Sequence, residues 1–303
     1  MNRALVQGTL PLRIFSYAGG SAELARISAQ PVISGQMPVI GVKLYADGAL
    51  GSRGAWLKAP YADAPHTKGL PLLTPEALRE QASAAVGMGK QVAVHAIGDA
   101  ANDMVLGAFK DVGCGKGDRR CRVEHAQIVD VADLDRFAAD KVIASMQPVH
   151  QTSDRTMAEA RLGPQRLGGA YAWQTLVKRR ARLALGSDFP VEDPNPFHGL
   201  AAAVSRQGLD DQPAGGWRPW ERLGQALAGF TRDAAYASFA EKQMGGLEPG
   251  QWADFILVDR DPAAASPHDL ARTQVLETWI AGRKVWEKEA VVPAQARTSG
   301  ERG

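Results

Sequence analysis

Short apolar runs alternate with segments of helical spacing over the first two thirds of the chain. The runs have the length of strands, and the segments between them place apolar residues three or four positions apart. Strands that alternate with helices at intervals of about thirty residues predict βαβ units and a parallel sheet, in a barrel or a doubly wound fold. The predicted strands are Leu10–Tyr17, Pro38–Ala46, Gln91–Ala96, Cys121–Ala126, Lys141–Met146 and Arg182–Gly186.

Capping residues mark the helices between these strands. Thr74 precedes a proline and a glutamate, so a capping side chain, a proline suited to the first turn and a first-turn acid follow one another. Two further helices open with an aspartate, whose side chain can accept hydrogen bonds from the free backbone amides. The predicted helices are Thr74–Met88, Asp99–Phe109 and Asp130–Ala139.

The pattern changes after the sixth predicted strand. Residues Glu221–Phe239 predict two helices with a break at Gly229-Phe230-Thr231. The runs Ala253–Val258 and Val275–Val285 are too short and too close together for βαβ units, so they predict a small appended sheet. Beyond them the chain is polar and has no periodicity, and we expect residues 290–303 to be disordered.

Composition excludes several classes of protein. The 303 residues carry 35 Lys+Arg against 33 Asp+Glu, without blocks of like charge, so nothing indicates nucleic-acid binding. No apolar stretch approaches the ~18 residues of a membrane span, and the start lacks the apolar segment of a secretory signal. Cys114 and Cys121 alone cannot form a disulfide framework, and we expect both to remain thiols. These features predict a cytoplasmic protein that binds neither nucleic acid nor a membrane.

Polar side chains stand near the C-terminal ends of four predicted strands. They are Lys43, His95, His125 and Asp188, and this end of a parallel barrel is where active sites form. Imidazole nitrogen and carboxylate oxygen suit Zn²⁺ or a similar divalent ion. Burial disfavours a lysine ammonium, whereas addition of CO₂ to the amine would make Lys43 a carbamate able to bridge two metals. Together the four residues favour a metal-dependent α/β enzyme.

Each of these residues also has an ordinary structural interpretation. A single histidine at a strand end is more often a hydrogen-bonded core residue, Asp188 could cap a turn, and Lys43 could extend to solvent. The coincidence at four strand ends is what favours the metal site. Two further residues near these strand ends are not assigned to the metal. Side-chain alternation along the strand points Glu124 away from His125, so we expect Glu124 to contact a helix. His150 follows a strand end, and we expect it to contact the pocket rather than to bind the metal.

Six collinear segments carry more specific motifs: Gly41–Arg53, Val94–Ala101, Arg122–Gln127, Ser145–Pro148, Leu185–Val191 and Gly246–Phe255. They resemble, in order and spacing, the motifs of the amidohydrolase superfamily, specifically its amidohydrolase-3 (YtcJ-like) metal-dependent hydrolases. The resemblance implies a (β/α)8 TIM-type barrel that is incomplete, with the third to eighth strands present. It assigns residues 1–242 to the partial barrel and 243–289 to a segment of a C-terminal β-sandwich.

The resemblance also implies an activity and a set of site residues. The activity is hydrolysis of carbon–nitrogen bonds in small non-peptide amides by a water bound to one or two divalent ions, of which Zn²⁺ is the first choice. The implied metal ligands are Lys43 in carboxylated form, His95, His125 and Asp188. Asp188 would also carry the proton from the water to the leaving nitrogen. The implied substrate-binding residues are Asp47, Arg53, Gln147, His150 and Phe189.

One feature departs from the family pattern. The family's first barrel strand carries a His-x-His ligand pair, and this sequence contains none. We therefore expect the chain to correspond to the C-terminal part of a longer hydrolase, to bind metal weakly and to have little activity alone. The alternative is an inactive or vestigial interaction protein of the same family, whose open barrel edges are covered by a second copy or a partner chain. A nucleotide site in Gly48–Gly54 is disfavoured because the loop lacks the P-loop lysine.

Overall fold

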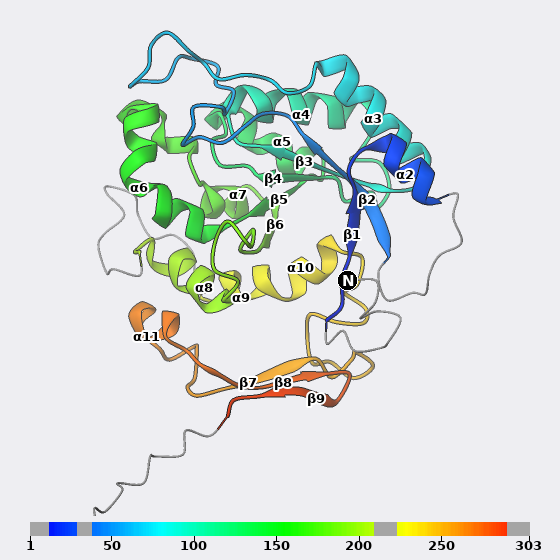
Figure 1. The fold of residues 1–303 in the computed structure, drawn as a ribbon, viewed down its shortest axis with the longest axis vertical. Helices are drawn as coiled ribbons and strands as arrows, with labels where there is room; N and C mark the ends of the chain where they lie inside the picture. The colour runs from blue at the N-terminus through cyan, green and yellow to red at the C-terminus, as the bar shows by residue number, and fades with distance from the viewer. Residues whose placement is uncertain (1–11, 29–37, 209–222, 290–303) are drawn as a thin grey trace, which may run out of the picture.

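A computed structural model describes residues 12–28, 38–208 and 223–289 of the chain. Six parallel strands form one sheet, in which neighbours in the sequence are also neighbours in space (Figure 1). All six predicted strands overlap observed ones, although the start of the first lies outside the described residues. The strands are β1 (Ser16–Ala18), β2 (Val39–Tyr45), β3 (Gln91–Ala96), β4 (Arg122–His125), β5 (Ile143–Met146) and β6 (Arg182–Leu185).

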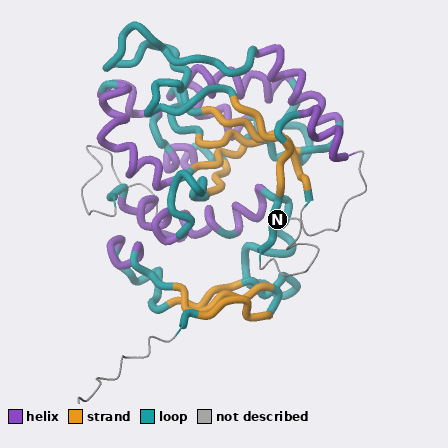
Figure 2. Tube along the Cα trace, viewed as in Figure 1, coloured by secondary structure: helices purple, strands orange, loops and turns teal. Residues whose placement is uncertain are grey.

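Helices join successive strands of this sheet and surround it (Figure 2). The predicted cap is confirmed in α3, where Thr74 Oγ1 accepts a hydrogen bond from the Ala77 amide at 3.2 Å. The predicted helix Asp130–Ala139 is divided into a short 3₁₀ turn and an α-helix. The elements are α2 (Ser21–Ser28), α3 (Pro75–Gly87), α4 (Asp99–Asp111), η1 (Val131–Asp133), α5 (Leu134–Ala139), α6 (Pro148–Leu162), η2 (Pro164–Gly169) and α7 (Trp173–Lys178).

Apolar side chains of these strands and helices pack into one large core. Val92 and Val94 of β3 are fully buried, as their shared face predicts, and Phe109 of α4 and Trp173 of α7 are buried with them. Burial of a side chain of this size contributes about 1.5–3 kcal/mol relative to exposure. The packing therefore holds the C-terminal ends of the strands in defined positions.

The rest of the described chain forms four helices and a small antiparallel sheet. The predicted break between two helices is confirmed, because α9 ends at Phe230 and α10 begins at Arg232. Figure 1 shows the small sheet, in the order β7-β8-β9, beyond α8 to α10 and away from the six-stranded sheet. The elements are α8 (Pro196–Ser205), α9 (Leu223–Phe230), α10 (Arg232–Ala237), β7 (Phe255–Val258), α11 (Pro267–Ala271), β8 (Val275–Ile280) and β9 (Arg283–Glu287).

A second, smaller core connects these elements. Phe197 and Leu200 of α8 pack with Leu270 of α11, and Val258 and Val275 of the small sheet contact the same cluster. The predicted tail, residues 290–303, lies outside the described residues. Among the described helices, none combines the length and apolar character needed to cross a membrane.

The expectation that both cysteines remain thiols is wrong. Cys114 and Cys121 are buried and joined by a disulfide. The chain turns back between α4 and β4 through Gly113 and Gly117, whose φ angles of +74° and +69° suit glycine. This turn brings the two cysteine Cα atoms to 5.8 Å, a separation that a disulfide spans. The sequence spacing of the cysteines carries no sign of this turn.

Candidate metal centre

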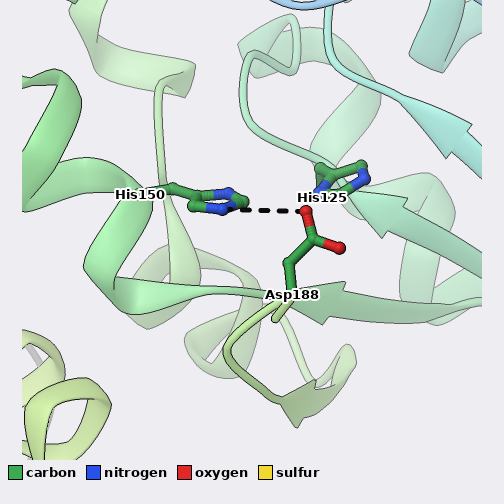
Figure 3. A group of neighbouring side chains, drawn as sticks. All are labelled: His125, His150 and Asp188. Carbon is green, nitrogen blue, oxygen red and sulfur yellow. Dashed lines mark ion pairs between the residues drawn. The ribbon is translucent and has the colours of Figure 1, made fainter. Parts of the chain in front are cut away.

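Three side chains capable of binding a metal ion converge at the C-terminal ends of the parallel strands. They are His125 at the end of β4, His150 in the first turn of α6 and Asp188 after β6 (Figure 3). One ligand atom from each lies within 4.8 Å of those from the other two, and His150 Nε2 is 3.8 Å from Asp188 Oδ2. The histidines are buried and the aspartate is exposed. The group is therefore open on the side of Asp188.

The backbone at the end of β4 explains how His125 enters this group. His125 has a φ angle of +77°, which breaks the regular alternation of side chains along the strand. Its Nδ1 is 2.9 Å from Gln147 Oε1, at the end of the neighbouring strand β5. A positive φ at a histidine is uncommon, so alternation along the sequence gave no sign of this turn.

The structure also corrects the orientation assigned to Glu124. This side chain is buried and pairs with Arg122 of the same strand, and Arg122 in turn donates to Ser145 Oγ of β5 at 3.0 Å. Its partners are therefore strand residues rather than helix residues. Burial raises the pKa of Glu124, and the Arg122 guanidinium outweighs that effect, so the pKa lies below its usual value. Glu124 interacts with Ser145 of β5, and His125 contacts Gln147, which follows β5.

His95, at the end of β3, lies beside the group. Its ring centroid is 4.6 Å from that of His125, and its Nε2 is 3.5 Å from Asp47 Oδ1. Burial, and then the charges of His125 and Lys43, lower the pKa of His95 to about 4. Burial and the charge of Lys43 likewise lower the pKa of His125 to about 4. Both imidazoles are therefore neutral at neutral pH, which is the form that binds a metal ion.

Lys43, on β2, lies within electrostatic reach of the same residues. Its ammonium is 5.2 Å from the centroid of the Tyr45 ring. Burial lowers the pKa of Lys43, while the nearby carboxylates of Glu124 and Asp188 act in the opposite direction. The four residues selected from the sequence as metal ligands thus influence one another through space, although they come from four different strands or strand ends.

The residues selected for substrate binding lie in different surroundings. Gln147 and His150 belong to the group just described, and the Phe189 side chain is 66% exposed next to Asp188. Arg53 instead pairs with Asp63 of its own loop, and the Asp47 carboxylate is buried beneath that loop. The structure therefore brings two of the five, Gln147 and His150, into contact with the candidate group, and Phe189 follows Asp188 in the chain.

Two buried nitrogen atoms at this site have no hydrogen-bond partner: Nε2 of His95 and Nε2 of His150. A buried nitrogen without a partner is costly, and neutral imidazole nitrogen is a preferred ligand of Zn²⁺. The donor set therefore fits a divalent cation. The sequence analysis predicted that His150 contacts the pocket but does not bind the metal, because His150 is not part of a strand. The signal that could have placed it with the ligands is Pro148, which starts α6 directly after β5 and puts His150 in the first helical turn.

The fold and the site together define an α/β protein that gathers metal-binding side chains at the C-terminal ends of a parallel sheet. Residues 2–286 match the family model described as the amidohydrolase family. The chain is 38% identical over 260 residues to Protein LONG AFTER FAR-RED 3 of Arabidopsis thaliana, covering 84% of this chain and 44% of that protein. It is 35% identical over 268 residues to the putative amidohydrolase YtcJ of Bacillus subtilis, covering 88% of this chain and 50% of that protein.

Among solved structures, an uncharacterized metal-dependent hydrolase from Pyrococcus horikoshii is similar to this chain with a TM-score of 0.79 and 32% identity. The match covers 88% of this chain and 54% of that one. The chain belongs to the amidohydrolase family, as its motifs indicate. It spans about half the length of the curated relatives it matches.

Proposed function

We propose that this chain carries the metal centre of a hydrolase that cleaves carbon–nitrogen bonds of non-peptide amides. The observation that carries the proposal is the convergence of His125, His150 and Asp188 within 4.8 Å, with His95 beside them. Neutral imidazoles, a carboxylate and two unpartnered buried nitrogens form a donor set suited to Zn²⁺. Membership of the amidohydrolase family supports an amide as the substrate class.

In this proposal, His125, His150 and Asp188 hold the ion together with His95, and Lys43 joins them after carboxylation. The desolvation that lowers the pKa of Lys43 favours the neutral amine, which is the form that reacts with CO₂. When bound, a divalent ion would lower the pKa of a coordinated water toward about 7 and polarise the substrate carbonyl.

Asp188 is the residue placed to move the proton. Its side chain is 39% exposed, so one carboxylate oxygen can face substrate while the other remains 3.8 Å from His150 Nε2. A carboxylate in this position can accept the proton of the attacking water and donate it to the leaving nitrogen. Gln147 and Phe189 would contact the substrate, and Arg53 and Asp47 belong to the loop proposed on the same side.

We further propose that the six parallel strands are consecutive strands of a (β/α)8 barrel and that β7 to β9 belong to a β-sandwich. Similarity to the Pyrococcus horikoshii hydrolase supports this arrangement. Within the described residues, β1 and β6 are the edge strands of the sheet, and a second copy or a partner chain would cover them. A cytoplasmic location stays a prediction.

The purified chain, reconstituted with Zn²⁺ and with bicarbonate, provides the test. Zinc content would be measured after gel filtration, and hydrolysis would be followed on a panel of N-formyl and N-acetyl amines. We expect Asp188→Asn to lower kcat by about 10²- to 10⁴-fold with little change in thermal stability, because the residue moves a proton at a partly exposed site. His268→Gln, in α11 and away from the group, is the matched control.

A second candidate function rests on the sequence, which lacks the family's His-x-His ligand pair. In that case the chain would be an inactive member of the family that acts by binding another chain. A zinc-free chain without turnover, even after reconstitution, would favour this alternative. The alternative would be excluded if the chain held stoichiometric zinc and hydrolysed a substrate, and if Asp188→Asn abolished that hydrolysis.

A further inference from the structure

Tyr45, the last residue of β2, places an aromatic ring beside the candidate metal centre and in contact with solvent. It lies opposite His95 in the register of β2 and β3, and the centroids of the two rings are 5.6 Å apart. Tyr45 is 53% exposed, although its neighbours Leu44 and Ala46 are buried. A bound molecule can therefore reach this ring without any movement of the strand.

The inner side of the Tyr45 ring is held by two neighbours. His95 meets it at a tilt of 41°, and the Lys43 ammonium lies 5.2 Å from its centroid. Because the ring is already in place, little conformational entropy is lost when a ligand packs against its exposed part. An aromatic ring that is fixed on one side and open on the other is suited to binding an apolar or aromatic group.

The histidines of the site separate Tyr45 from Asp188. Strands β3, β4 and β5 lie between β2, which ends at Tyr45, and β6, which Asp188 follows. The ring centroids of His95 and His125 are 4.6 Å apart, and those of His125 and His150 are 5.8 Å apart. The side chain of Asp188 is 39% exposed. A substrate bound over the histidines would therefore meet the Asp188 carboxylate at one end and the Tyr45 ring at the other.

The role proposed for Asp188 sets the direction of an amide in this site. Asp188 gives the proton to the leaving nitrogen, so the nitrogen lies on the Asp188 side of the histidines. In an amide, the nitrogen and the acyl substituent are bonded to different sides of the carbonyl carbon. The acyl substituent therefore extends away from Asp188 and toward Tyr45.

We propose that Tyr45 binds the acyl substituent of the substrate and that this substituent is apolar, with an aromatic ring preferred. Two aromatic rings in offset or edge-to-face contact attract each other beyond the area that they bury. The direction of the amide rests on the proposed function, because it depends on proton transfer by Asp188. The affinity of the Tyr45 ring for an aromatic group does not, since that contact needs neither a metal ion nor a reaction.

The first experiment measures binding without turnover. Saturation-transfer NMR titrations of N-methylbenzamide would be recorded with the metal-free chain, and N-methylacetamide would serve as the ligand without a ring. We expect Tyr45→Ala to raise the Kd for N-methylbenzamide by about 10-fold, and Tyr45→Phe, which keeps the ring, to leave it nearly unchanged. Trp286→Ala, which removes a half-exposed ring of β9, is the matched control. Equal binding by the wild type and Tyr45→Ala would overturn the proposal.

The second experiment tests the direction of the amide in the zinc-reconstituted chain. One series of substrates varies the acyl group on methylamine, as formyl, acetyl and benzoyl. The other keeps the acetyl group and replaces methylamine by benzylamine. We expect Tyr45→Ala to lower kcat/KM for the benzoyl compound by about 10-fold, chiefly through KM, and to leave the ratio between the two acetyl compounds unchanged. A change in the amine preference instead of the acyl preference would contradict the proposed direction.

The failure of this proposal and that of the proposed function give different results. If Tyr45→Ala loses affinity for N-methylbenzamide but the wild type hydrolyses nothing, the proposed function and the direction of the amide fail, and the aromatic site at Tyr45 stands. If Asp188→Asn abolishes hydrolysis while Tyr45→Ala affects every acyl group equally, the proposed function stands and the role of Tyr45 is refuted.

Discussion

The two sheets of this chain are built on different principles. In the parallel sheet, β3 and β5 are buried along almost their whole length, because helices cover them and their side chains join the large core. In the small antiparallel sheet, no residue of β7, β8 or β9 is buried. Its strands are aligned by backbone pairing and by side-chain pairs across the ladder, such as the stacked rings of Phe255 and Trp279 at 5.4 Å.

This difference bears on where chemistry can be located. A metal centre needs side chains held to within a fraction of an ångström, and close packing on both faces provides this in the parallel sheet. The small sheet has Trp286 and Leu257 about half exposed, so neighbouring side chains constrain its residues less. The candidate site accordingly lies at the ends of the packed strands.

The largest expected difference between the two regions is in the cost of removing an aromatic side chain. Phe109→Ala, at a fully buried position of α4, should lower the free energy of unfolding by about 3–5 kcal/mol through lost burial and a residual cavity. Trp286→Ala in β9, where the side chain is half exposed, should cost about 1 kcal/mol. Urea denaturation followed by far-ultraviolet circular dichroism measures both. Comparable losses would show that the small sheet is as tightly packed as the large one.

Ion pairs give the second comparison. Glu124→Gln leaves the largely buried Arg122 guanidinium without its carboxylate and should destabilise the fold by about 3 kcal/mol. Glu277→Gln removes a pair with Lys284 in the small sheet, at 3.3 Å and open to solvent, and should cost no more than about 0.5 kcal/mol. Double-mutant cycles with Arg122→Met and Lys284→Met isolate each pair. A coupling energy in the exposed pair equal to that of the buried one would refute this contrast.

The third comparison concerns pH. The pKa of His125 is about 4 in the folded chain and about 6.5 when unfolded, so the unfolded state binds more protons between these values. The free energy of unfolding should therefore rise with pH over this window and fall on acidification. His125→Gln should reduce that slope by up to about 1.4 kcal/mol per pH unit, measured in metal-free protein.

His268→Gln serves as the matched control for the pH measurement, because His268 lies in α11 with its side chain 47% exposed. Both variants would be unfolded with urea at several pH values between 4 and 7. The same reduction of slope in both variants would mean that burial of His125 is not its cause.

Regular structure was largely predictable from the sequence. The bounds of β3 agree with the prediction, and the break between α9 and α10 lies where the Gly229-Phe230-Thr231 segment indicated it. These predictions succeed because apolar periodicity and capping residues report local conformation and burial. The prediction of thiols at Cys114 and Cys121 was wrong because the chain turns back at Gly113 and Gly117, whose φ angles are positive. The prediction that Glu124 contacts a helix was wrong because its partners, Arg122 and Ser145, lie on strands.

The sequence alone determined which segments become strands and helices and that Lys43, His95, His125 and Asp188 stand at strand ends. Tertiary structure alone decided that His150 joins the metal-binding group and that Asp47 lies under a loop. Periodicity records which face of an element is buried, and that information is local. Distances between residues from different elements depend on how loops turn and how helices begin, and no repeat in the sequence encodes these.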